Sequence, residues 1–159
     1  GTPKAASFRA TSAKNTFKGR VASSNPESGV FINNSAKTLI VTEGTIDMFS
    51  LMTMRSNYQD FDYLSTESVA NTTNVLKWHL QFRKDVSEYD RIVLALDNDE
   101  KGKEITVEAI EMLEKSFPGV TIEYDFPEAK DWNEELVNLS KKEEVTLTKE
   151  VAPQMGMQL

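Results

Sequence analysis

The sequence predicts one α/β domain in which a mainly parallel sheet of about four strands is flanked by helices. Three observations support this fold class. From Thr38 onward, short runs rich in β-branched residues alternate with longer segments of helical periodicity. Turn residues and acids separate these segments. The length of 159 residues suits one domain with its own hydrophobic core.

The first 28 residues are rich in Ser, Ala, Thr, Lys and Asn, and predict an irregular leader with a short strand near Phe17–Ala22. Gly29–Asn33 is expected to form a strand that ends at the turn signal Asn33-Asn34-Ser35. Residues 1–37 carry six basic side chains and one acidic one, although the whole chain has a net charge of −7. This segment is either a basic arm that contacts phosphates or a solvated leader.

The next segments begin the alternating pattern. Thr38–Thr42 predicts a buried strand that ends at Glu43-Gly44. Ile46–Asn57 is apolar on nearly all sides and predicts a buried helix. Asp62–Ser65 predicts a short strand. Asn71-Thr72-Thr73 offers caps for a helix whose core-facing residues are expected to be Val75, His79, Phe82 and Val86.

Arg91–Leu96 is the clearest strand of the sequence, and the acids of Asp97-Asn98-Asp99 follow it. The helix that comes next is stopped by Pro118-Gly119. Val120–Tyr124 predicts a strand and Asp131–Ser140 a last short helix, and no structure is predicted from Lys141 onward. The residues of the long helix expected to face the core are Ile105, Ala109, Met112, Leu113 and Phe117.

Acidic residues follow two of the best strands. Glu43 ends the first, and Asp97 and Asp99 follow the second, where residues two apart in an extended chain point to the same side. If these strands are parallel neighbours, their carboxylates share one crevice, where Mg²⁺ would relieve the repulsion. Asp131 joins them if Val120–Tyr124 is also parallel. The alternative is that Asp97, Asp99 and Asp131 are only helix N-caps, and Asp47 is expected to be structural.

Three motifs resemble those of the Toprim family. Val41–Leu51 (VTEGTIDMFSL) resembles the glutamate motif of Toprim domains in bacterial primases. Ile92–Lys103 (IVLALDNDEKGK) resembles the family's DxD motif, in a form also seen in phage-type primase-helicases. Lys130–Leu136 (KDWNEEL) resembles the late KD motif of primases. The motifs stand in family order, and Phe17–Ile32 is similar to the lead-in of Toprim proteins from plasmids and conjugative elements.

The resemblance implies a Toprim-like, Rossmann-like fold and a role for each matching residue. Glu43 would be the general acid/base, Asp97 and Asp99 would hold Mg²⁺ (or Mn²⁺), and Asp131 would help a second ion. Asn133 stands where the family has a second late acid, which weakens that second site. The resemblance also implies that Lys103 is a candidate for phosphate contact. The residues themselves add Lys130 as a cation for a phosphate and Gly44 as a tight turn beside the ligand.

The implied activity is phosphoryl or nucleotidyl transfer by a primase-like domain of a plasmid or other mobile-element DNA replication or transfer protein. Its partners would be single-stranded DNA, nucleoside triphosphates and other domains of a larger protein. The alternatives are strand cleavage of nuclease or topoisomerase type, and a non-catalytic nucleic-acid-binding module. We expect a basic leader over residues 1–37, the catalytic domain over 38–141 and a tail over 142–159.

Composition excludes several other classes of site. The chain has no cysteine, which excludes disulfides and thiolate metal sites and is compatible with a cytoplasmic location. It has no apolar run long enough for a bilayer span. We expect the only histidine, His79, and the two tryptophans, Trp78 and Trp132, to serve mainly in packing.

Overall fold

The structure is a computed structural model that describes residues 5–9, 17–82 and 89–151. Its centre is a five-stranded sheet with the order β3-β5-β4-β6-β7. Strands β5, β4, β6 and β7 are parallel, as the sequence predicted, and β3 pairs antiparallel with β5 at one edge. The strands are β3 (Val30–Ile32), β4 (Thr38–Thr42), β5 (Asp62–Ser65), β6 (Arg91–Leu94) and β7 (Thr121–Tyr124).

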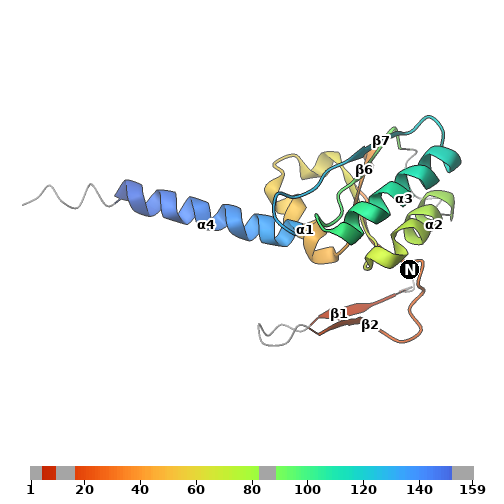
Figure 1. The fold of residues 1–159 in the computed structure, drawn as a ribbon, viewed down its shortest axis with the longest axis horizontal. Coiled ribbons are helices and arrows are strands. Elements are labelled where there is room, and N and C mark those ends of the chain that lie inside the picture. Colours follow the sequence, from red (N-terminus) through yellow and green to blue (C-terminus); the bar gives the residue numbers. More distant parts are fainter. Residues whose placement is uncertain (1–4, 10–16, 83–88, 152–159) are drawn as a thin grey trace, which may run out of the picture.

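Helices lie on both sides of this sheet (Figure 1). They are α1 (Thr45–Met54), α2 (Thr72–Phe82), α3 (Glu100–Ser116) and α4 (Trp132–Val151). Helix α4 starts beside α1 and then projects away from the sheet (Figure 1). Short 3₁₀ turns at Tyr58–Asp60 (η1) and Val69–Asn71 (η2) precede β5 and α2.

Alternation along the strands divides the core into two layers. In β4, Leu39 and Val41 pack with the layer that contains α2 and α3, whereas Ile40 packs with α1 and with Trp132 at the start of α4. Ile92 and Val93 of β6 divide in the same way. These parallel strands are therefore buried on both faces, which explains why they are apolar runs in the sequence.

Three helix predictions need correction. The first helix is buried on one side only, because Ile46 and Phe49 of α1 are 40% and 49% exposed. In α2 the core residues are Val75, Leu76 and His79, whereas Phe82 is 64% exposed; Val86 lies outside the described residues. The last helix does not end at Ser140 but continues to Val151. It projects beyond the sheet (Figure 1), so no core contact marks where it ends.

A second, two-stranded sheet precedes the domain. It pairs β1 (Ser7–Arg9) antiparallel with β2 (Lys18–Arg20), and it lies apart from the main sheet in Figure 1. The strand predicted near Phe17–Ala22 is thus confirmed, while β1 was not predicted. The Arg20 guanidinium donates to the carbonyls of Asn25 at 3.0 Å and Ser28 at 2.7 Å, which holds the loop that leads to β3.

Candidate functional site at the carboxyl edge of the sheet

Three neighbouring parallel strands end side by side and each is followed by an acid. The N–H of Ala95 donates to the carbonyl of Val41 at 2.8 Å, so β6 and β4 stay paired to their ends. On the other side of β4, the Thr66 N–H donates to the carbonyl of Thr42 at 3.0 Å. Glu43 and Asp97 therefore leave the same edge of the sheet from adjacent strands, as predicted.

These acids line a cleft of about 770 Å³ between the sheet edge and the β1–β2 ribbon. The ribbon contributes Phe8, Gly19 and Arg20, among others. Lys130, just before α4, and Asn133, in its first turn, also line the cleft. The sheet edge therefore contributes acids to this cleft, whereas the ribbon contributes an aromatic ring and a guanidinium group. The five carboxylates that line the cleft are Glu43, Asp47, Glu67, Asp97 and Asp131.

Asp97 is the most perturbed carboxyl of this cleft. Its Oδ1 atom is buried and accepts no hydrogen bond from any residue that the structure describes. Burial is the largest cause that raises the pKa of Asp97 to about 7, and the negative charges of Glu43, Asp47, Asp131 and Asp99 add to it. A carboxylate held in this way gains from any cation that enters the cleft.

Gly102 explains how α3 begins so close to this acid. A Cβ atom added at Gly102 would lie 2.1 Å from the carbonyl oxygen of Asp97, which no side chain could tolerate. The glycine of the DNDEKG sequence is therefore needed so that the first turn of α3 packs on the backbone of Asp97. This contact fixes the direction in which the Asp97 loop leaves β6.

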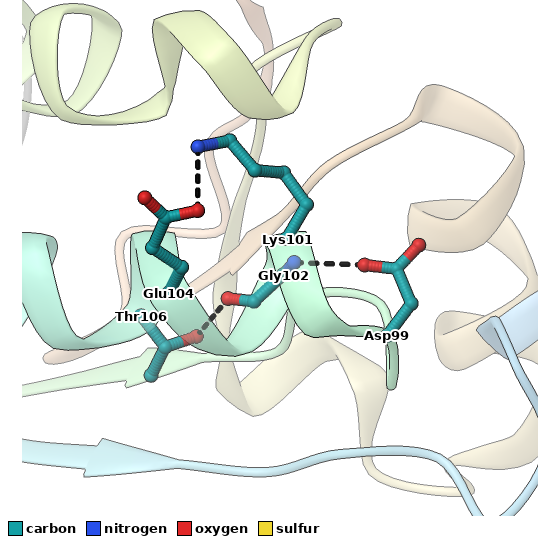
Figure 2. Close-up of polar contacts among 5 residues, drawn as sticks. All are labelled: Asp99, Lys101, Gly102, Glu104 and Thr106. Atoms are coloured by element: carbon teal, nitrogen blue, oxygen red, sulfur yellow. Dashed lines mark hydrogen bonds and ion pairs between the residues drawn. The ribbon is translucent and has the colours of Figure 1, made fainter.

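Asp99 has a second task that the sequence allowed as an alternative. Figure 2 shows its Oδ1 atom accepting a 2.8 Å hydrogen bond from the N–H of Gly102, which makes Asp99 the N-cap of α3. Asp99 is not among the residues that line the cleft. Lys103 also lies outside the cleft lining, one turn into α3 and exposed. Asp99 is still close enough to Asp97 for its charge to help raise the pKa of Asp97, although neither Asp99 nor Lys103 lines the cleft.

The late motif is fastened directly to the Asp97 loop. The N–H of Asn98 donates to the carbonyl of Lys130 at 2.8 Å, and the side chains of Lys130 and Asp131 line the cleft. Asp131 also caps α4, since its Oδ1 accepts from the N–H of Glu134 at 2.8 Å. Asp131 therefore serves as a cap and as a cleft acid at once, so the two interpretations of this residue do not exclude each other.

Gly44 lies in a bend of the chain, close to the side chain of Asp47. Its backbone is extended, with φ −118° and ψ 150°, which any residue adopts. A Cβ atom there would lie 2.6 Å from Oδ2 of Asp47. The chain bends at Glu43 and Gly44 between β4 and α1, and the absence of a side chain at Gly44 leaves room for the Asp47 carboxylate beside Glu43.

Two acids of the cleft were missed from the sequence. Asp47 was expected to be structural; its Oδ1 does accept a 3.3 Å bond from the N–H of Asn133, yet it also lines the cleft. Glu67 was not considered, although it follows the Asp62–Ser65 strand as Glu43 follows β4. Its position shortly after a third predicted strand was the signal that could have identified Glu67 from the sequence.

Glu67 links the sheet edge to the ribbon. Its φ of 62° is in the left-handed region, where a non-glycine residue is uncommon. Burial acts to raise its pKa, but hydrogen bonds from Thr45, Ser65 and Ser7 and the charge of Arg20 outweigh it and lower the pKa. The Ser65 hydroxyl donates to Oε1 at 2.7 Å, and the Thr45 hydroxyl donates to the same atom. Glu67 is thus held as an anion.

The donor set of the cleft suits a hard divalent cation. The side chains that could bind a metal there are carboxylates, which offer oxygen atoms, and the buried Oδ1 of Asp97 is one such atom. Among the described residues, no group of three or more Asp, Glu, His or Cys side chains is gathered tightly enough to form a complete metal site. Mg²⁺ commonly takes one or two protein carboxylates and completes its shell with water and phosphates.

Comparisons with known proteins agree with this geometry. A family model described as Toprim-like matches residues 40–136. No curated protein matches the chain. No helix within residues 5–9, 17–82 and 89–151 combines the length and apolar character that a membrane span requires.

Two solved structures share the fold. The primase fragment of the bacteriophage T7 primase-helicase protein has a TM-score of 0.61 and 20% identity, over 82% of this chain and 52% of that one. A second structure shows the bacteriophage T7 lagging-strand DNA polymerase interacting with primase domains of two gp4 subunits bound to an RNA/DNA hybrid and dTTP. It has a TM-score of 0.58 and 20% identity, over 82% and 64% of the two chains. This chain thus spans about half to two thirds of their length.

Proposed function

The chain belongs to the Toprim-like family, and from that premise we propose that it is the Mg²⁺-dependent nucleotidyl-transfer domain of a primase-type replication protein. The family and the shared fold support a nucleic-acid-related role. The further assignment to a plasmid or mobile-element protein rests on the similarity of Phe17–Ile32 to lead-in segments of such proteins. Single-stranded DNA, nucleoside triphosphates and other domains of a larger cytoplasmic protein are the partners that we propose.

The observation that carries the proposal is the state of Asp97. Burial, followed by the charges of Glu43, Asp47, Asp131 and Asp99, raises the pKa of Asp97 to about 7, and no described residue donates a hydrogen bond to its buried Oδ1 atom. Such an arrangement is costly unless a cation compensates it. We propose that Asp97 is the principal ligand of Mg²⁺, or of Mn²⁺ in its place, with Asp99 and Asp131 as further ligands. The ion would supply charge neutralisation for phosphate groups in the cleft.

The remaining residues of the cleft have separate tasks in this proposal. Glu43 leaves β4 next to Asp97 and transfers a proton at the attacking hydroxyl or the leaving oxygen. Lys130 lines the same cleft and contacts a phosphate as a point charge. Lys103, which lies outside the cleft lining, would meet a phosphate only where the strand continues along the start of α3.

A non-catalytic nucleic-acid-binding module is the second candidate. The observation that favours it is that Asp99 and Asp131 each use a carboxylate oxygen to cap a helix. Asn133 adds an amide in place of an acid at the edge of the cleft. In that case the cleft would bind a nucleic-acid strand without catalysing a reaction on it. Strand cleavage by the same acids is a further alternative. The assay distinguishes it from synthesis, because cleavage shortens an oligonucleotide and synthesis lengthens one.

The deciding experiment compares Glu43→Gln with wild type in the full-length protein that contains this chain. Proton transfer typically contributes about 10²–10⁴-fold to a rate, so metal-dependent oligonucleotide synthesis should fall by at least about 10²-fold. Affinity for Mg²⁺ and for single-stranded DNA should change by less than about threefold. Glu111→Gln, at an exposed position of α3, is the matched control. Full activity of Glu43→Gln removes it as the acid/base, and an inert wild type favours the binding module.

A further inference from the structure

A second cavity of about 540 Å³ adjoins the acidic cleft. The two hollows share Ser7, Arg20, Val30 and Glu67 in their walls, so they meet at the ribbon. The first hollow is rich in carboxylates, whereas the second is mostly apolar and aromatic. Together they offer an acidic end, where the proposed function places a cation, and an aromatic end.

The walls of the second cavity suit a flat ring. Trp78 and Phe82 project from α2 with ring centroids 6.3 Å apart, and Phe82 is 64% exposed. Phe31 of β3 lines the same cavity. The small side chains of Ala5 and Ala6 also line the cavity. Cavities of about 300–1,000 Å³ with aromatic walls and a few polar groups are typical of small-molecule sites.

The polar groups at its rim offer both kinds of hydrogen bond. The Arg20 guanidinium is held in place by the carbonyls of Asn25 and Ser28. Glu67 is a fixed anion that accepts hydrogen bonds, and Glu27 adds a second carboxylate. Base edges carry N–H donors and carbonyl or ring-nitrogen acceptors, which such groups can pair with.

We propose that this cavity binds the base of a nucleotide, stacked on Trp78, while the phosphate of the same nucleotide lies in the adjoining acidic cleft. The inference rests on the proposed function, because it assigns a phosphate to that cleft. It assigns base binding to Trp78 of α2. Helix α2 lies on the opposite face of the sheet from α1 and α4. Either a free nucleoside triphosphate or a nucleotide within a single strand supplies this chemistry, and the experiment separates the two.

The test measures binding of ATP, GTP, CTP, UTP and a short single-stranded oligonucleotide by titration calorimetry, with and without Mg²⁺. Base–aromatic stacking typically contributes enough that Trp78→Leu should weaken the bound ligand roughly tenfold. Trp78→Phe retains a ring and should lose less than about threefold. Phe49→Leu, at a 49% exposed position of α1, is the matched control and should bind as wild type does. Thermal melts establish that each variant is folded.

The ligand that loses affinity identifies the source. A loss for triphosphates alone indicates a free nucleotide, and a loss for the oligonucleotide alone indicates a strand; both support the site. Unchanged affinity of folded Trp78→Leu for every ligand overturns it. Free nucleosides separate this inference from the proposed function, because Asp97→Asn should leave their binding intact. If Trp78→Leu weakens nucleoside binding while Glu43→Gln keeps full activity, the base site stands and the catalytic proposal fails.

Discussion

The indole N–H of Trp132 donates a buried 2.9 Å hydrogen bond to the carbonyl of Ala95, 37 residues earlier in the chain. Ala95 follows β6 and Trp132 begins α4, so this bond ties the late motif to the Asp97 loop. Trp132 is only 6% exposed, which confirms its packing role. Because Asp131 directly precedes Trp132, this hydrogen bond also holds Asp131 beside the cleft.

Trp132→Phe should destabilise the fold and displace Asp131. The substitution leaves the Ala95 carbonyl without its indole donor, and a buried unsatisfied group costs roughly 1–3 kcal/mol. Urea denaturation should show a loss of this size with an unchanged slope. Trp78→Phe, which involves no such bond to the sheet, is the control. If the two variants are equally stable, the indole bond does not anchor α4.

Asp97→Asn should stabilise the protein in metal-free buffer near pH 8. The pKa of Asp97 is about 7 in the folded protein and 3.8 in its reference state, so folding favours the protonated form. The contribution of this group to stability is complete below pH 3.8 and is lost as pH rises to about 7. The gain from Asp97→Asn should therefore be near zero at pH 4 and roughly 1–3 kcal/mol above pH 7, after allowance for partial exposure.

Denaturation in the presence of EDTA, at several pH values, checks this difference. Asp90→Asn, at an exposed position, is the matched control. Added Mg²⁺ should reduce the advantage of the variant, because an ion compensates the ionised wild-type carboxylate. A gain that is equal at pH 4 and pH 8 would contradict the assignment of the raised pKa to Asp97.

Asp97→Asn and Asp99→Asn should affect metal affinity unequally. Asp97 lines the cleft with a buried, unpaired oxygen, whereas Asp99 caps α3. Calorimetry with Mg²⁺ and nucleotide should show at least a roughly tenfold loss for Asp97→Asn and a smaller loss for Asp99→Asn, since few protein ligands share the ion. Asp99→Ala should in addition cost about 1 kcal/mol of stability through the lost cap. Unchanged affinity in both Asn variants would remove these acids from the site.

The ribbon should account for part of the salt dependence of strand binding. Deletion of residues 1–37 is a poor test, because it removes β3 from the main sheet. Arg9→Ser with Lys18→Ser instead alters two paired positions of β1 and β2. If both contact phosphates, the slope of log K against log salt for a single strand should flatten by about 1.4. Lys115→Ser with Lys141→Ser is the charge-matched control, and an identical slope in both pairs makes the ribbon a connector.

Much of the fold was predictable because the central parallel strands β4 and β6 are buried on both faces. Residues 39–41 and 92–94 are therefore apolar, and such runs stand out between helical segments. The acids that follow them could be placed at one edge because parallel strands end there together. Helix faces were less certain: Phe82 fits the apolar stripe of α2 but is exposed.

The sequence by itself determined the family, the parallel core and the candidate acids Glu43, Asp97 and Asp131, because local patterns encode strand burial and the motifs are contiguous. Only the tertiary structure decided which acids share a cleft. Asp47 meets the N–H of Asn133 across 86 residues, and Glu67 meets the hydroxyl of Thr45 across 22. Long-range contacts of this kind depend on how helices pack across the sheet, and no local pattern records them. The aromatic cavity at Trp78 exists for the same reason, since the ribbon and α2 meet there only in the folded chain.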